Sequence, residues 1–272
     1  MFAVAIAIIL LPVAGYILIL GAFVVLQERL IFRPDEARGE PYLAISAPGM
    51  PVALRTERGT DLGCWLLSPA SPGAPTALYL HGNGGNIAYR AERVQQFARL
   101  GWGVFLLGYR GYGGNDGQPS ERGLLEDARA GLAMLASENK SGPILVWGES
   151  LGSGLAVQLA VDTRVQGLVL EAPYLNLGDI VARSMPWLRP ALPLLRHRFD
   201  AGAVIGRVRC PIIVLMSEED QVVPPASTRA LCALARIPPV LVVLPGGHNA
   251  LGTTEAFDRI EAYLSPRNRC PI

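Results

Sequence analysis

The hydrophobic pattern of the chain has two parts: one unbroken apolar run at the N-terminus, and a long region in which short apolar runs alternate with amphipathic ones. Met1 to Leu26 contains no charged side chain and is dominated by Ile, Leu, Val, Ala and Phe. A helix over residues 2–26 would be about 37 Å long at 1.5 Å per residue, enough to cross a hydrocarbon core of about 30 Å with some tilt. The pattern predicts a transmembrane anchor over residues 1–27, in contact with the membrane through residues 2–26.

Two other interpretations of this run remain open. A cleaved signal peptide has a basic start, an apolar core of about 7 to 15 residues and a small-x-small exit, whereas this run lacks the first and third and exceeds the second. A buried core helix is the other alternative, but an all-round apolar helix at a terminus fits lipid better. Arg29, Arg33 and Arg38 follow the run, so the positive-inside rule favours a cytoplasmic catalytic domain on a single-pass membrane protein.

The rest of the chain predicts a linker and one catalytic domain. Residues 28–50 contain several prolines among mixed charges and are expected to form a juxtamembrane linker, followed by the domain over residues 51–266. Period-2 and short apolar runs predict strands at 52–56, 63–67, 76–80, 103–107, 144–147, 168–170, 212–216 and 240–244. Amphipathic or apolar helical runs predict helices at 87–100, 121–136, 151–161, 226–235 and 254–264. This alternation predicts an α/β fold whose central sheet is mostly parallel, with helices on both faces.

Composition narrows the function classes. A net charge of +1 with 17% charged residues leaves no basic stripe, so a nucleic-acid partner is not expected. The four cysteines, Cys64, Cys210, Cys232 and Cys270, form no C-x-x-C pair and no zinc spacing. We therefore expect no metal and no cofactor, and the sequence leaves the oligomeric state open.

A serine stands at the centre of the most informative stretch. Gly148-Glu149-Ser150-Leu151-Gly152 matches Gly-x-Ser-x-Gly and lies between a predicted buried strand and a predicted helix. This context is that of a nucleophile elbow, in which the serine occupies the apex of a sharp turn and the glycines let neighbouring backbone pass. The alternative is a tight turn whose serine only caps the helix. We expect Ser150 to be a nucleophile.

A serine hydroxyl needs an imidazole base, and the imidazole needs a carboxylate. Of the three histidines, His81 lies in a glycine-rich loop, and His197, between two arginines, is expected to be solvated. His248, in the loop after the last predicted strand, is the expected base. Asp220, after strand 212–216, is the expected acid in the order Ser…Asp…His, with Glu171 and Glu219 as rivals.

The loop after strand 76–80 predicts the oxyanion hole. It reads His81-Gly82-Asn83-Gly84-Gly85-Asn86 and precedes a predicted helix, so that its backbone N–H groups can face a developing negative charge. We expect the N–H groups of Asn83 and Leu151 to be the donors. Neither G-x-x-x-x-G-K-[ST] nor G-x-G-x-x-G occurs here, which argues against a nucleotide site.

Together these stretches resemble a known family. The loops at 81–86 and 109–113, the elbow at 148–152, Asp220 with residues 223–225, and residues 247–249 are similar to the α/β-hydrolases of the Bem46-like, ABHD13-like group. The resemblance covers about residues 52–264 and implies the α/β-hydrolase fold, serine hydrolysis and one N-terminal hydrophobic anchor. The chain departs from the group at Gly108, where an aspartate commonly precedes Tyr-Arg-Gly-Tyr-Gly.

The expected activity is that of a carboxylesterase-like or thioesterase-like serine hydrolase acting on a small or lipid-like ester or thioester. Residues 172–219 are too few for a large cap domain, so a minimal lid is expected. Their apolar, proline-interrupted part covers the cleft, dips toward the bilayer, or packs against the domain as ordinary helices do. Peptide hydrolysis or acyl transfer on the same three residues, and a non-catalytic membrane-tethered binding module, remain as alternatives.

Overall fold

The computed structural model describes residues 2–35, 49–138, 142–163 and 165–264, with side chains from Leu10 onward. Within them an eight-stranded sheet runs in the order β10-β9-β8-β7-β4-β6-β3-β2. Its strands are β2 (Met50–Arg55), β3 (Asp61–Leu67), β4 (Thr76–Leu80), β6 (Gly103–Leu106), β7 (Ile144–Glu149), β8 (Gly167–Glu171), β9 (Ile212–Met216) and β10 (Val240–Val243). Strand β3 pairs antiparallel with both neighbours, and the remaining pairs are parallel. The predicted α/β-hydrolase fold with a mostly parallel sheet is confirmed.

Helices cover both faces of this sheet. They are α2 (Ala91–Arg99), α3 (Glu121–Glu138), α4 (Leu151–Asp162), α6 (Pro225–Ala233) and α7 (Thr254–Leu264). On β7 the indole of Trp147 packs against Phe97 of α2 and Phe257 of α7, at centroid distances of 5.1 and 4.8 Å. The next residue, Gly148, faces α4 on the opposite side. Because side chains alternate along a strand, α2 and α7 lie on one face and α4 on the other.

The predicted helix over 87–100 is divided in two. A 3-10 turn, η2 (Ile87–Arg90), comes first because the side chain of Asn86 accepts a hydrogen bond from the N–H of Ala88. Arg90 then has non-helical dihedral angles, φ −106° and ψ 18°, and α2 begins at Ala91. The sequence pattern did not reveal this break at Arg90.

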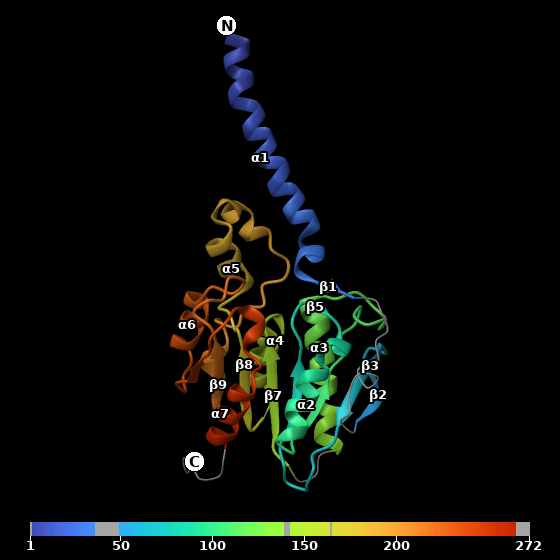
Figure 1. The fold of residues 1–272 in the computed structure, drawn as a ribbon. Coiled ribbons are helices and arrows are strands. Elements are labelled where there is room, and N and C mark those ends of the chain that lie inside the picture. The colour runs from blue at the N-terminus through green and yellow to red at the C-terminus, as the bar shows by residue number, and fades with distance from the viewer. Residues whose placement is uncertain (1, 36–48, 139–141, 164, 265–272) are drawn as a thin grey trace.

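A long N-terminal helix, α1 (Phe2–Ile31), projects from the sheet domain as a stalk (Figure 1). The most apolar 18-residue stretch within Leu10–Ile31 has a mean hydropathy of 2.2, and only 6% of that stretch is buried. Among the described residues α1 is the helix long and apolar enough to cross a membrane, judged by length and composition. The helix extends beyond residue 27 into the predicted linker, of which residues 36–48 lie outside the described residues.

A short strand joins the stalk to the sheet domain. After Phe32, β1 (Arg33–Pro34) pairs in parallel with β5 (Gly84–Gly85), which belongs to the glycine-rich loop after β4. The N–H of Arg33 donates to the carbonyl of Asn83 at 3.0 Å, and the Asn83 side-chain amide donates to the carbonyl of Ile31 at 3.1 Å. The end of α1 is therefore bonded directly to the loop expected to hold the oxyanion.

Between β8 and β9 the chain forms a small helical segment beside α1. It contains α5 (Leu177–Ser184), the 3-10 helix η3 (Pro186–Leu194) and the short turn η4 (Ile205–Arg207). Figure 1 shows α5 and η3 on the same side of the sheet as the stalk. The segment is small, as the length of residues 172–219 predicts.

Candidate active site

The predicted elbow is a sharp turn between β7 and α4. Ser150 has φ 50° and ψ −115°, a backbone conformation that L-residues rarely adopt. A Cβ on Gly148 would lie 2.6 Å from the Gly152 carbonyl oxygen, and a Cβ on Gly152 would lie 2.0 Å from the Leu80 carbonyl oxygen. Both glycines are therefore required because backbone passes within contact distance. The turn brings Ser150 to the wall of a cavity.

Three predicted residues meet at this turn. Ser150 Oγ lies 2.9 Å from His248 Nε2, and His248 Nδ1 lies 2.8 Å from Asp220 Oδ2. His248 begins the 3-10 turn η5 (His248–Ala250) after β10, and Asp220 follows β9. Since a carboxylate only accepts, His248 Nδ1 carries a proton and its Nε2 is free to accept the serine proton.

Asp220 is held as a carboxylate. Its Oδ1 accepts the backbone N–H groups of Val222 and Val223, each at 2.8 Å, while its Oδ2 faces His248. Burial by itself raises the pKa of Asp220, but the hydrogen bonds from His248, Val223 and Val222 outweigh burial and lower the pKa below its usual range. The side chain is thus charged and fixed in orientation.

The rival acids lie elsewhere. Glu171 is buried beside Arg93, at 2.6 Å from its Nη2, and also accepts from the Trp147 indole. Glu219 is exposed. Neither has a hydrogen bond to His248 among those of the described residues.

The other two histidines have structural surroundings. His81 is fully buried, and its Nδ1 lies 2.8 Å from the Gly82 carbonyl oxygen. Burial lowers its pKa to about 4, so the ring is neutral at physiological pH. The expectation that His197 is solvated was wrong: only 12% of its side chain is exposed, because it packs edge-on against Phe32 at 5.1 Å and accepts the N–H of Glu121.

The two expected oxyanion donors come from the elbow, where Leu151 follows Ser150, and from the loop after β4, which contains Asn83. Leu151 is the first residue of α4, so its N–H belongs to the first helical turn, which has no intrahelical acceptor. Asn83 lines the same cavity as Ser150, and its side chain turns away to the Ile31 carbonyl. The Asn83 side chain is therefore engaged elsewhere, and its backbone N–H stays the expected donor.

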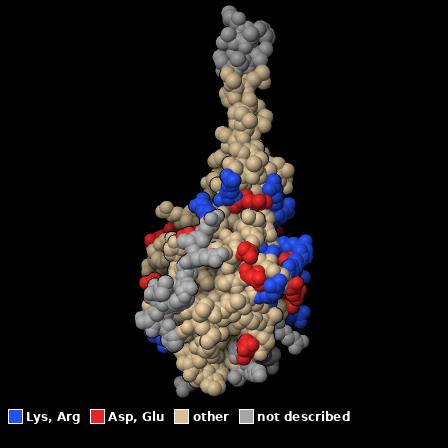
Figure 2. Space-filling model, turned by 90° about the vertical axis from the view of Figure 1, so that its right-hand side faces the viewer, with Lys and Arg blue, Asp and Glu red and all other residues tan. Residues whose placement is uncertain are grey.

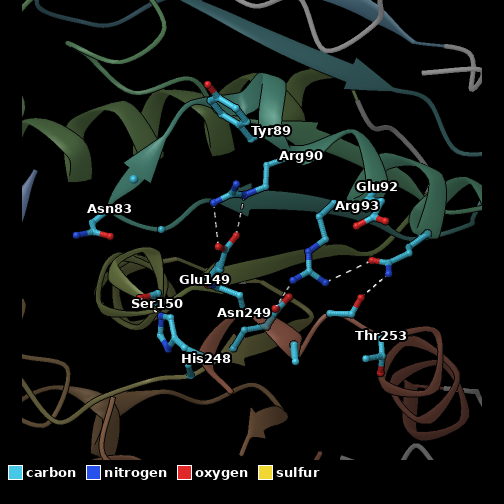
Figure 3. Close-up of a pocket in the computed structure, with 17 residues that line it drawn as sticks. Asn83, Tyr89, Arg90, Glu92, Arg93, Glu149, Ser150, His248, Asn249 and Thr253 are labelled. Atoms are coloured by element: carbon cyan, nitrogen blue, oxygen red, sulfur yellow. Dashed lines mark hydrogen bonds and ion pairs between the residues drawn. The ribbon is translucent and has the colours of Figure 1, made fainter. Parts of the chain in front are cut away.

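The cavity beside Ser150 has a volume of about 580 Å³ and a mainly polar lining (Figure 3). Arg90 forms a bidentate ion pair with Glu149, with Nε and Nη2 each 2.9 Å from a carboxylate oxygen. Burial raises the pKa of Glu149, but Arg90 and Arg93 outweigh burial and lower it. The wall next to the serine therefore carries guanidinium and carboxylate groups together.

Sequence reasoning missed Arg90 and Arg93. The detectable signal was two arginines at i and i+3 in an otherwise amphipathic segment, close after the glycine-rich loop. Their carboxylate partners lie 59 and 78 residues further along the chain. The described residues contain no group of three or more His, Cys, Asp or Glu side chains arranged to hold a metal ion.

Comparison with known proteins identifies the family. Residues 74–204 match the family model described as serine aminopeptidase, S33. Protein Rv2307c of Mycobacterium tuberculosis, described as uncharacterized, is 37% identical over 94% of this chain and 95% of its own length. The α/β hydrolase domain-containing protein WAV2 of Arabidopsis thaliana is 31% identical over 81% of this chain and 80% of its own length. The chain belongs to the α/β-hydrolase family.

Further relatives agree with the predicted group. Protein bem46 of Schizosaccharomyces pombe is 30% identical over 64% of this chain and 61% of its own length. A protein named lysophosphatidylserine lipase ABHD12 from Danio rerio is 29% identical over 63% of this chain, which spans about half of that protein, 54%. The predicted resemblance to Bem46-like serine hydrolases is confirmed, and with it the prediction that the chain is a hydrolase of this family.

Solved structures show the same fold. The esterase Pf2001 of Pyrococcus furiosus superposes with a TM-score of 0.71, covering 85% of this chain and 98% of that one, at 20% sequence identity. At this identity the likeness concerns the fold alone.

Proposed function

We propose that this α/β-hydrolase is a membrane-anchored enzyme that hydrolyses lipid-like carboxylic esters, with Ser150 as nucleophile, His248 as base and Asp220 as orienting acid. The observation that carries the proposal is the continuous relay from Ser150 Oγ through His248 to Asp220, at 2.9 and 2.8 Å. These distances lie within the hydrogen-bond range that a nucleophile and its base need. The name of the ABHD12 relatives, a lysophosphatidylserine lipase, supports a lipid ester as substrate.

In the proposed reaction, Ser150 Oγ attacks the ester carbonyl carbon while His248 Nε2 takes the hydroxyl proton. The backbone N–H groups of Leu151 and Asn83 stabilise the oxyanion of the tetrahedral intermediate. The intermediate collapses by breaking the bond to the alcohol oxygen, which leaves with the proton from His248. Water, deprotonated by His248, then attacks the acyl group on Ser150, releases the carboxylic acid and restores the serine.

The polar cavity suggests where the alcohol part of the ester lies. Its wall carries Arg90 and Arg93 beside Glu149 and Glu171, an arrangement that can bind groups of either charge by hydrogen bonds. An acyl chain gains little from such a wall, since burial of apolar groups against charges leaves the charges without solvent. We therefore propose that the cavity receives a polar alcohol group and that the acyl chain extends away from it.

Labelling with a fluorophosphonate probe tests the mechanism. Wild-type protein purified in detergent should be labelled, whereas Ser150→Ala and His248→Ala should not, because the probe reports an activated serine. Absence of label on folded wild-type protein would contradict the proposal and favour a binding module. Labelled protein is then assayed on p-nitrophenyl esters of increasing chain length, acyl thioesters and a lysophospholipid, with release of the free acid as the measurement.

Peptide hydrolysis is the second candidate, because the matching family model is described as a serine aminopeptidase. An aminopeptidase needs a carboxylate for the substrate ammonium group. Of the three glutamates that line the cavity, Glu149 and Glu171 are paired with Arg90 and Arg93, and Glu92 is exposed to solvent. We therefore expect esters to be cleaved faster than aminoacyl p-nitroanilides. The opposite order of kcat/KM would favour the peptidase.

The anchor and its orientation belong to the same proposal. We propose residues 2–26 as the spanning segment, and exposed Arg29 and Arg33 at its end support a cytoplasmic catalytic domain by the positive-inside rule. Protease digestion of sealed membrane vesicles of known orientation tests this. The catalytic domain should be degraded in inside-out vesicles and protected in right-side-out vesicles.

A further inference from the structure

The 3-10 helix η3 presents an apolar surface to its surroundings. Met185, Trp187 and Leu194 are 37%, 50% and 59% exposed, while Leu188 and Ala191 of the same segment are buried against the protein. Large side chains exposed together in this way mark a surface that contacts another apolar phase. Three prolines, Pro186, Pro190 and Pro193, also reduce the number of N–H groups that must find an acceptor.

Specific hydrogen bonds fix η3 against α1. The Tyr16 hydroxyl donates to the Trp187 carbonyl oxygen at 2.5 Å. Nearer the base of the stalk, Gln27 is buried; its Nε2 donates to the Leu194 carbonyl oxygen at 3.3 Å, and its Oε1 accepts the Arg196 N–H at 2.8 Å. The two contacts are separated by about 16 Å along the helix axis, so η3 lies along α1 rather than touching it at one point.

The position of Tyr16 on α1 determines how deep η3 reaches. A hydrocarbon core takes about 20 helical residues, and every such stretch within residues 2–26 contains Tyr16. If the core ends at Gly21, the shallowest placement, Tyr16 still lies about 8 Å inside that boundary, at 1.5 Å per residue. Trp187, bonded to Tyr16, must then lie within the bilayer too.

Charged residues favour the shallow placement. Arg189 is exposed two residues after Trp187, and its guanidinium must reach the headgroup phosphates, as arginines near a membrane boundary do. Figure 2 shows the uncharged stalk and, where it meets the body, a gathering of charged residues. Glu28, near the end of α1, pairs with Arg196 at 3.1 Å, with about half of each side chain exposed. The charges thus lie at headgroup level and the tip of η3 just beyond it.

We propose that η3 inserts into the bilayer leaflet beside α1, with Trp187 and the adjacent Met185 among the acyl chains and Leu194 at the level of the headgroups. This inference rests on the proposed membrane anchoring by α1. The occupant of the surface is lipid because α1 and η3 are bonded together and lipid is the phase around α1 at that level. The catalytic domain is then embedded at two points, and an acyl-chain substrate approaches from within the leaflet.

Tryptophan quenching by brominated lipids tests the proposal on the full chain reconstituted into phosphatidylcholine vesicles. Of the four tryptophans, Trp65, Trp102 and Trp147 are at most 5% exposed, so contact quenching reports Trp187. We expect lipids brominated near the headgroup end of the acyl chain to quench emission most, and lipids brominated at the chain end to quench least. Trp187→Phe, which keeps an aromatic ring at the position, should abolish the effect.

Carbonate extraction of the same vesicles separates the two proposals. A chain that resists extraction but whose Trp187 emission is insensitive to brominated lipid would retain its anchor and overturn the insertion of η3, pointing to a protein partner or a second copy on this surface. A chain released by carbonate would overturn the anchoring and the insertion together. Quenching that persists in Trp187→Phe would also overturn the insertion, since it would come from another tryptophan.

Discussion

Replacing Asp220 by Asn separates the charge of this residue from its shape. Asp220 Oδ1 accepts two backbone N–H groups, from Val222 and Val223, and Oδ2 accepts from His248. In Asp220→Asn the amide oxygen must take the place of Oδ1, because an NH2 group there would face two donors. The NH2 group then points at His248 Nδ1, which must give up its proton and become the acceptor.

The tautomer of His248 decides the size of the effect. With Nδ1 unprotonated, the neutral ring carries its proton on Nε2 and cannot accept the proton of Ser150, 2.9 Å away. Forcing the wrong tautomer in a serine-histidine-aspartate arrangement costs about 10⁴ in kcat, or about 5 kcal/mol at 1.36 kcal/mol per factor of ten. We expect a loss of this size with little change in KM.

The assay is the initial rate on p-nitrophenyl butyrate, with thermal unfolding to confirm that the variant is folded. Glu219→Gln is the matched control, since it makes the same chemical change at the neighbouring exposed acid, and it should keep its activity within about twofold because surface changes away from a site have small effects. Retention of more than about a tenth of wild-type kcat by Asp220→Asn, or an equal loss in Glu219→Gln, would refute the role given to Asp220.

Three further changes probe the surroundings of the site. Arg90→Ala removes the ion-pair partner of half-buried Glu149, which keeps its hydrogen bond from Tyr79, and should lower the unfolding free energy by about 3 kcal/mol. Arg55→Ala, in an exposed pair, should lower it by at most about 1 kcal/mol, and denaturant titration measures both. Folding lowers the pKa of His81 from 6.5 to about 4. The neutral His81 ring therefore makes its full contribution to the unfolding free energy above pH 6.5, and this contribution is lost as pH falls toward 4. It amounts to at most about 3 kcal/mol, so His81→Gln should unfold with a weaker pH dependence. Gly152→Ala must displace the backbone at Leu80 and should reduce kcat about 100-fold or more.

Strands and helices that are bounded by glycine, proline or polar residues could be predicted accurately from the sequence. Strands Thr76–Leu80 and Ile212–Met216 and helix Thr254–Leu264 have the predicted bounds, because each is a clear apolar or amphipathic run between glycine, proline or polar residues. The break at Arg90 was not predictable, since it depends on a side-chain cap from Asn86 rather than on periodicity.

The same distinction applies to the site. The sequence was sufficient to predict that three residues form one site, because chain order and loop position are properties of the sequence. These residues are Ser150, Asp220 and His248. The surroundings of His197 could not be predicted, because its burial against Phe32 depends on where the end of α1 docks. The two flanking arginines favoured a solvent-exposed His197, but tertiary packing buries most of the side chain.

The pairing of β1 with β5 has a consequence for work on soluble fragments of this enzyme. The usual way to obtain such a fragment is to remove the apolar segment together with the residues that follow it. Here a cut after Pro34 would also remove the N–H that Arg33 donates to Asn83 and the Ile31 carbonyl that accepts from Asn83. Low activity of that fragment would then reflect a loosened glycine-rich loop rather than the loss of the membrane. A fragment that begins before Gln27 keeps these bonds and is the fair comparison.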